Sequence, residues 1–170
     1  KIMIETPVLI VGGGPVGLAL AGDLGWRGIA CTLIEKSDGV VGQPKMDLVH
    51  VRTMEFCRRW GLVEQVEAAG FNRNYSQYYA WITGLADGYE LGREPFPPCA
   101  MDPGPEQSPQ RRERCPQNFF DPVLKRHAQS YPHVTMRYET EMVSFTEAAD
   151  GVTAELEDKR SGRRETVRAK

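Results

Sequence analysis

A glycine-rich turn near the start of the chain has residue types and a spacing that could hold a phosphate group. Gly12, Gly14 and Gly17 form the pattern G-x-G-x-x-G, with Pro15 and Val16 between the second and third glycines. At this spacing, the first glycine permits a tight turn and the second lets the backbone approach a pyrophosphate without an intervening Cβ. The third allows a helix to pack closely on a strand. Free N–H groups and the positive end of the helix dipole would then hold the anion.

An acidic residue completes this pattern. Glu35 follows the glycines at the spacing of about 20 residues that is typical of a dinucleotide site. Its carboxylate could accept hydrogen bonds from a ribose hydroxyl and would repel the 2′-phosphate of NADP. A glycine-rich turn in an unrelated α/β protein is the alternative, but it does not explain why glycines and acid coincide with the elements described next. The pattern alone leaves FAD and NAD as equal candidates.

The elements that must position these residues are predicted to form a βαβ unit. Residues 8–11 and 29–35 have the apolar, β-rich pattern of buried strands, and residues 15–27 have a helical pattern. Connections this short imply parallel strands and a right-handed crossover. Further along, the patterns predict helices at 51–60, 62–69 and 118–130, a hairpin from 75–83 and 89–91, and strands at 134–138, 142–147, 152–157 and 165–169. The predicted fold class is α/β, with a Rossmann-like core, a β-meander and the start of a β-rich domain.

Composition excludes several classes of protein. The 170 residues include 21 Lys+Arg against 23 Asp+Glu, for a net charge of −2, which gives no basic surface for nucleic acid or an anionic membrane. No apolar stretch approaches the roughly 20 residues needed to span a bilayer, and no secretory signal is visible. We therefore expect a cytoplasmic protein. The scattered cysteines predict free thiols and no metal site: Cys31, Cys57, Cys99 and Cys115.

Three stretches, in order along the chain, resemble the amino-terminal part of FAD-dependent aromatic-ring hydroxylases. These are the single-component flavoprotein monooxygenases related to para-hydroxybenzoate hydroxylase and phenol hydroxylase. The first stretch is residues 8–36, and the second is Arg-Thr-Met-Glu at 52–55 followed by a helix ending at Gly61-Leu62. The third is Cys115-Pro116-Gln117 before the predicted helix at 118–130.

The resemblance implies roles for residues around the glycine-rich turn. The turn would hold the pyrophosphate of FAD through Gly12, Gly14, Pro15, Val16 and Gly17. Glu35 would bind the adenosine ribose, and Lys36 stands where a basic residue commonly contacts the adenosine. Lys36 could equally be a solvated surface charge.

Three later residues also receive a role from the resemblance. Lys45 stands where the family often has an Arg near the flavin and pyrophosphate, and Gln117 matches a polar residue that contacts the ribityl chain or flavin. Asp47 falls, by a gapless count back from Arg52, where some phenol-hydroxylating members place an active-site acid. It is the one candidate catalytic residue.

The activity that the resemblance implies is hydroxylation of a small phenolic or other aromatic substrate. NADH or NADPH would reduce FAD, the reduced flavin would react with O₂, and a flavin C4a-hydroperoxide would deliver one oxygen atom. Family members carry an Asp-Gly motif just beyond the position where this chain stops, and much later a Gly-Asp motif that completes the riboflavin site, so neither motif falls within these 170 residues. We therefore expect an incomplete chain that needs the rest of the protein to complete its site. A homodimer is left open.

The expected domain division follows the same resemblance. Residues 1–72 and 111–170 would form two parts of the FAD-binding domain, and residues 73–110 would belong to a substrate-binding domain. Seven of the twelve prolines lie between residues 95 and 116, which indicates a long irregular segment or a crossing between domains.

Several alternatives stay open. An NAD-dependent dehydrogenase, a nucleotide-binding module without activity, or a flavin halogenase or reductase would share the glycine-rich turn. Arg52 and Glu55 could simply form an ion pair within a helix. A solvated loop is expected for Arg111, Arg112 and Arg114. The aromatic side chains of the hairpin region could line a substrate pocket or alternate between buried and exposed faces: Tyr75, Tyr78, Tyr79 and Trp81.

Overall fold

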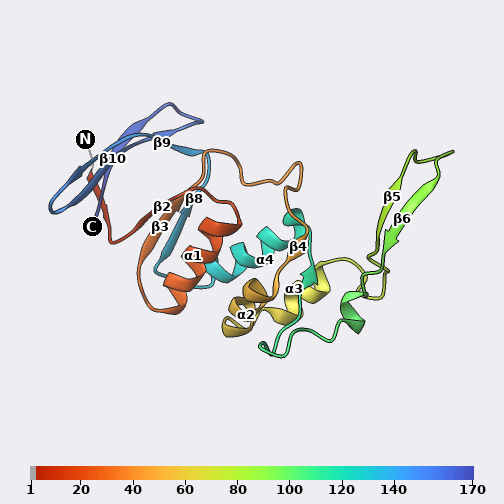
Figure 1. The fold of residues 1–170 in the computed structure, drawn as a ribbon. Helices are drawn as coiled ribbons and strands as arrows, with labels where there is room; N and C mark the ends of the chain where they lie inside the picture. The colour runs from red at the N-terminus through yellow and green to blue at the C-terminus, as the bar shows by residue number, and fades with distance from the viewer. Residues whose placement is uncertain (1–2) are drawn as a thin grey trace. The chain divides into compact units, whose positions relative to one another are not determined.

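The computed structural model describes residues 3–170, which fold as two compact units (Figure 1). Within the described residues, the first unit combines residues 3–44 with Gln117–Lys170, and the second is Lys45–Pro116. Residues 45–72 therefore group with residues 73–116 and not with the glycine-rich turn. The functional division at residues 72 and 111 stays a prediction, because compactness does not show which residues bind a substrate.

A parallel three-stranded sheet carries the glycine-rich turn. Its order is β2 (Leu9–Val11), β3 (Cys31–Ile34) and β8 (Val134–Arg137), and α1 (Pro15–Trp26) connects the first two strands. All four residues of the central strand β3 are buried, which explains its continuous apolar sequence. The predicted βαβ unit is confirmed.

The helix α4 (Gln117–Gln129) packs against α1 in the same unit (Figure 1). The approach is close, because a Cβ at Gly22 would lie 2.6 Å from the His127 ring and one at Gly25 would lie 2.5 Å from the Tyr131 ring. These small residues of α1 therefore form the contact surface with α4 and the segment after it.

A second sheet in this unit has the order β1-β11-β10-β9. Its strands are β1 (Met3–Thr6), β9 (Thr140–Ala148), β10 (Gly151–Asp158) and β11 (Arg164–Ala169). The antiparallel pairs confirm the predicted meander, whereas the parallel pairing of β1 with β11 was not predicted. Ile34 of β3 joins Ala154, Leu156 and Val167 of this sheet in one buried cluster, so the two sheets share a core.

The second unit begins with β4 (Leu48–Val49), α2 (Val51–Arg59) and α3 (Val63–Ala69). Gly61, with a φ of 71°, makes the turn between the two predicted helices. The strands β5 (Tyr79–Ile82) and β6 (Glu90–Glu94) pair as the predicted antiparallel hairpin. A 3₁₀ turn at Cys99–Met101 and β7 (Glu113–Arg114), which pairs with β4, complete the unit.

The proline-rich segment of the second unit is organised around a buried arginine. Arg112 is 9% exposed, and its Nε lies 2.7 Å from Asp102 Oδ2. Its guanidinium donates hydrogen bonds to Gln77 Oε1 at 2.7 Å and to the Pro97 carbonyl at 2.8 Å, and it lies over the Phe96 ring. The expectation that this arginine belongs to a solvated loop is wrong, because an acid and two carbonyl oxygens far apart in sequence surround it.

The aromatic side chains of the hairpin region are exposed, between 46% and 64%, in the part of the chain that the structure describes: Tyr75, Tyr78, Tyr79 and Trp81. All four residues of β5 are exposed, so burial does not alternate along this strand. Among residues 3–170, no helix is long and apolar enough to cross a membrane.

Candidate functional site

The glycine-rich turn places the end of β2 directly against the start of α1. Gly12 has a φ of 114°, in the region that favours glycine, and its N–H donates to the Ile34 carbonyl of β3 at 2.8 Å. A Cβ at Gly17 would lie 1.9 Å from the Gly12 carbonyl oxygen. The tight turn and the close helix approach that the spacing predicts are therefore both present.

The amino terminus of α1 is open to an anion. Gly14 is the residue before the helix, and a Cβ there would meet no atom within 4 Å. Pro15 occupies the first turn, which holds neither a capping side chain nor an acidic residue. The first N–H groups of a helix have no partner within the helix, so this end offers donors and the positive end of the helix dipole. The Val16 side chain is 83% exposed beside it.

Glu35 lies at the side of the turn and is fixed by three hydrogen bonds. Gly13 N–H donates to Oε2 at 2.7 Å, and the Ser37 N–H and hydroxyl each donate to Oε1 at 2.8 Å. Burial opposes ionisation of this carboxyl, but these hydrogen bonds outweigh it and lower the pKa of Glu35. The carboxylate is therefore ionised at neutral pH, and Oε2 keeps a lone pair for a further donor.

The middle glycine of the turn, Gly13, has a role that the glycine spacing does not predict. A Cβ at Gly13 would lie 2.8 Å from the Glu35 Cβ. Only glycine therefore lets the acid approach the backbone here, and this close approach could not be anticipated from spacing alone.

Two cavities are lined in part by residues of the glycine-rich turn. One, of about 260 Å³, is lined by Val11, Gly12, Ile34, Glu35, Lys36, Thr140, Glu141 and Met142. The other, of about 410 Å³, is lined by Gly13, Leu18, Gly39, Val40, Val41, Asn118, Asp121, Pro122, Lys125 and Tyr138. The structure thus brings Glu35 and Lys36 to one cavity, and Gly13 and the first turns of α4 to the other.

Gln117 is the first residue of α4, and its Nε2 donates to Asp121 Oδ2 at 3.1 Å. Asp121 is 5% exposed, and burial raises the pKa of its carboxyl while the Gln117 hydrogen bond acts in the opposite direction. Asp121 Oδ1 and Asn118 Oδ1 are buried and have no hydrogen-bond partner among the described residues 3–170. The sequence indicated Asn118 and Asp121 only as possible helix caps, although the spacing of four residues from Gln117 to Asp121 places these two side chains on one face of a helix.

Lys45 and Asp47 belong to the second unit. Asp47 Oδ2 lies 2.6 Å from Arg114 Nη2, and the Asp47 carbonyl accepts a hydrogen bond from Cys115 N–H at 2.8 Å. These contacts accompany the pairing of β4 with β7. Lys45 is exposed at the start of the unit. The cofactor and catalytic roles of Lys45 and Asp47 stay predictions.

The structure assigns simpler roles to other candidates. Arg52 Nη1 and Glu55 Oε2 lie 2.7 Å apart, so the ion pair within α2 is confirmed. All four cysteines are buried, and within residues 3–170 none of them forms a disulfide. Within residues 3–170 there is no group of three or more His, Cys, Asp or Glu side chains that could hold a metal ion.

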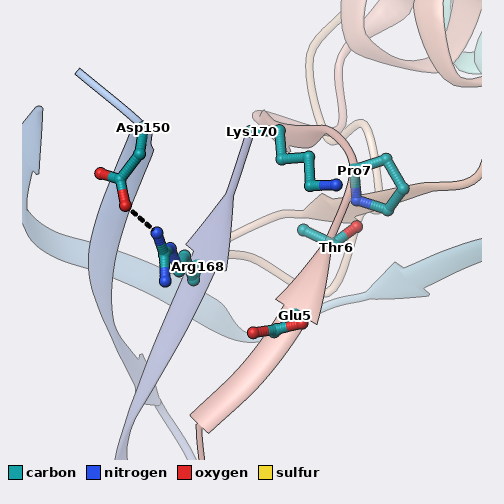
Figure 2. Close-up of a pocket in the computed structure, with 6 residues that line it drawn as sticks. All are labelled: Glu5, Thr6, Pro7, Asp150, Arg168 and Lys170. Atoms are coloured by element: carbon teal, nitrogen blue, oxygen red, sulfur yellow. Dashed lines mark hydrogen bonds and ion pairs between the residues drawn. The ribbon is translucent and has the colours of Figure 1, made fainter. Parts of the chain in front are cut away.

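A third cavity, of about 350 Å³, lies beside β1 and β11 and is lined by Glu5, Thr6, Pro7, Asp150, Arg168 and Lys170 (Figure 2). Two of these residues contact each other, since the Arg168 guanidinium donates to the Asp150 carboxylate. None of its residues belongs to the glycine-rich turn or to α4.

Comparison with known proteins identifies the class. The model of the FAD binding domain family matches residues 5–170, and the chain belongs to this family. The predicted α/β fold and the resemblance to FAD-dependent aromatic hydroxylases are confirmed, and FAD is the cofactor of the family.

Among curated relatives, the chain is 32% identical to 4-methyl-5-nitrocatechol 5-monooxygenase of a Burkholderia species, over 98% of this chain and 30% of the relative. It is 30% identical to phenol 2-monooxygenase of Pseudomonas sp. strain EST1001, over 99% of this chain and 28% of the relative. The chain therefore spans about 30% of the length of these relatives.

Two solved structures share the fold closely. The rebeccamycin biosynthetic enzyme RebC with reduced flavin has a TM-score of 0.89 and 34% identity, covering 99% of this chain and 32% of RebC. The flavin-dependent monooxygenase PieE in complex with FAD and substrate has a TM-score of 0.85 and 31% identity, covering 98% of this chain and 29% of PieE.

Proposed function

We propose that this chain is the FAD-binding part of a monooxygenase that hydroxylates a phenolic or other aromatic molecule with NADH or NADPH and O₂. The single observation that supports this most is the open glycine-rich turn with Glu35 at its side, in a chain of the FAD binding domain family. The names of its relatives, which include a phenol and a nitrocatechol monooxygenase, support the reaction and the substrate class.

The residues of the turn fit the dinucleotide part of FAD. The space at Gly14 and the uncapped start of α1 suit the pyrophosphate, since both would be obstructed by a larger residue or an acidic cap. The remaining lone pair on Glu35 Oε2 suits a ribose hydroxyl, and Lys36 lines the same cavity. Gly12, Pro15, Val16 and Gly17 shape the turn. Gln117 would contact the ribityl chain from the start of α4.

Bound FAD would supply the redox chemistry, accepting a hydride from the nicotinamide and activating O₂. The residues of this chain bind and orient it. The backbone donors of the turn would hold the pyrophosphate of FAD, and the Glu35 carboxylate would hold its adenosine ribose.

The main alternative is a FAD-binding module that does not hydroxylate. The experiment that separates the two uses the complete natural chain carrying these residues. We expect a bound flavin absorbance spectrum, NADH or NADPH oxidation stimulated by a phenol, and a product that has gained one oxygen atom. Flavin binding with no oxygenated product from a panel of phenols would favour the module, and absence of bound flavin would overturn the proposal altogether.

The 170 residues alone should bind FAD weakly and hydroxylate nothing, because the relatives are about three times longer and a large part of the flavin site would come from the remainder. Stoichiometric FAD retained through gel filtration by this chain alone would contradict this expectation. A cytoplasmic location, a small aromatic substrate and a homodimer stay predictions.

A further inference from the structure

Three consecutive charged residues connect separate segments of the second unit. Glu113 is 2% exposed and accepts a hydrogen bond from Arg73 Nε, in the segment before the β5–β6 hairpin, at 2.8 Å. Arg114 Nη2 lies 2.6 Å from Asp47 Oδ2, directly before β4. Arg112 contacts the segments at both ends of the hairpin. The aromatic hairpin and the segment of Asp47 are therefore joined through adjacent residues of one strand and its approach.

The Arg112 guanidinium holds both ends of the hairpin. Before β5, Gln77 Oε1 accepts a hydrogen bond from Nη1 at 2.7 Å, and after β6 the Pro97 carbonyl accepts one from Nη2 at 2.8 Å. The guanidinium also lies 3.8 Å from the centre of the Phe96 ring. That ring meets Tyr79, the first residue of β5, in an edge-to-face arrangement with the ring centres 5.8 Å apart. A planar guanidinium with five N–H donors can make these contacts at once, whereas the compact ammonium of a lysine cannot.

The strands of the hairpin have little packing of their own that could fix their direction. All four residues of β5 are exposed, and in β6 only Gly92 is half-buried. A two-stranded hairpin without a packed face is marginal in water, so the contacts at its base set its direction. Because β6 is five residues long, a tilt of about 10° at the base would move its far end by about 3 Å. The contacts of Arg112 therefore decide where the aromatic side chains of the hairpin lie.

We propose that Arg112 is a positioning residue for the aromatic substrate. By holding the base of the hairpin, it fixes Tyr79 and Trp81 relative to Asp47, the candidate catalytic acid. Tyr79 and Trp81 are two residues apart on β5, so they share one face of the strand, and they are 51% and 54% exposed. Such a pair of rings suits the ring of a phenolic molecule. This inference rests on the proposed function, since only a protein that acts on an aromatic molecule would use this face to bind one.

The test is steady-state hydroxylation of a phenol by the complete natural chain. Arg112→Lys keeps a cation beside Asp102 but cannot hold Gln77 and the Pro97 carbonyl together. The KM for the phenol should rise about fivefold to tenfold. The kcat should change by less than about twofold, because the hairpin would contact the ring of the substrate and not the reacting atoms. FAD affinity should not change, since the glycine-rich turn lies in the other unit.

Two further variants and a control separate positioning from a general loss of structure. Gln77→Ala removes the partner before β5, and its combination with Arg112→Lys should raise KM no more than the stronger single change, because both act on the same base. Trp81→Ala removes one exposed ring and should raise KM in the same direction with the fold intact. The matched control is Arg111→Lys, the same substitution at an exposed neighbour, which should leave KM unchanged.

Each other outcome is decisive. An unchanged KM in Arg112→Lys, or a loss of kcat and FAD affinity as large as the change in KM, would overturn the positioning role. A raised KM in Arg112→Lys with an unchanged KM in Trp81→Ala would overturn it too, because the hairpin face would then pack against the remainder of the natural chain and not against the substrate. In all these cases the unaltered protein still hydroxylates the phenol, so the proposed function stands. If the unaltered protein bound FAD but hydroxylated no phenol, the proposed function would fail and this inference with it.

Discussion

At the scale of single residues, each glycine of the turn meets a different physical constraint. At Gly17, a Cβ would lie 1.9 Å from the Gly12 carbonyl oxygen, so only glycine fits there. At Gly14, a Cβ would meet no atom within 4 Å. Gly17 is therefore needed for the fold itself, and Gly14 is free for a ligand. The glycine spacing predicts both residues but does not separate these two reasons.

Substitution by alanine should distinguish the two glycines. Gly17→Ala should lower the free energy of unfolding by about 2–3 kcal/mol, because the backbone carbonyl it meets cannot move aside as a flexible side chain could. Gly14→Ala should change it by less than about 1 kcal/mol, yet weaken FAD binding about tenfold or more. Chemical denaturation and FAD titration of both variants check this, and equal stability losses would contradict it.

Glu35 should make stability depend on pH. Its pKa is lowered from the ordinary value of 4.5 in the folded protein, so the unfolded chain binds this proton first as pH falls. Its contribution is complete well above pH 4.5 and is lost as pH falls through the lowered folded value. Glu35→Gln should therefore show a smaller loss of stability between about pH 6 and pH 3. Denaturation curves across this range, with the exposed Glu147→Gln as control, measure the difference.

At the scale of elements, patterns that are local in sequence are reliable guides. The buried run of β3, the helix α1 and the meander β9 to β11 appear close to their predicted bounds. The pairs β1–β11 and β4–β7 were missed, since each joins short segments far apart along the chain. Arg112 was misjudged for the same reason: its partners approach only when the proline-rich segment folds back.

The proline-rich segment should depend on this arginine. Arg112→Ala leaves Asp102, whose side chain is 15% exposed, without its cation and Gln77 without a donor, so we expect a loss of about 3 kcal/mol or more. Arg111→Ala is the matched control, because Arg111 is exposed and has one hydrogen bond of 3.3 Å to a carbonyl. Its effect should stay within about 0.5 kcal/mol. Similar losses in both variants would refute the assigned role of Arg112.

At the scale of the whole molecule, both units enclose their thiols. Burial raises the pKa of Cys57 to about 11 and also raises the pKa of Cys31. Because the thiolate is the reactive form, the native protein should not react with a thiol reagent at pH 8, and all four cysteines should react after denaturation. A colorimetric thiol count before and after unfolding tests this; rapid reaction of even one native thiol would contradict the burial.

The sequence by itself determined the α/β class, the glycine-rich turn, the acid beside it and the order of most elements. These depend on residue periodicity, on spacing and on the conformational freedom of glycine, which act over a few residues. Tertiary structure alone decided that Gly13 admits Glu35, that Asp121 lines the cavity at Gly13, and that Arg112 is buried. Each of these features depends on the distance between elements that are far apart in sequence and pack together in the fold. No local sequence pattern encodes that distance.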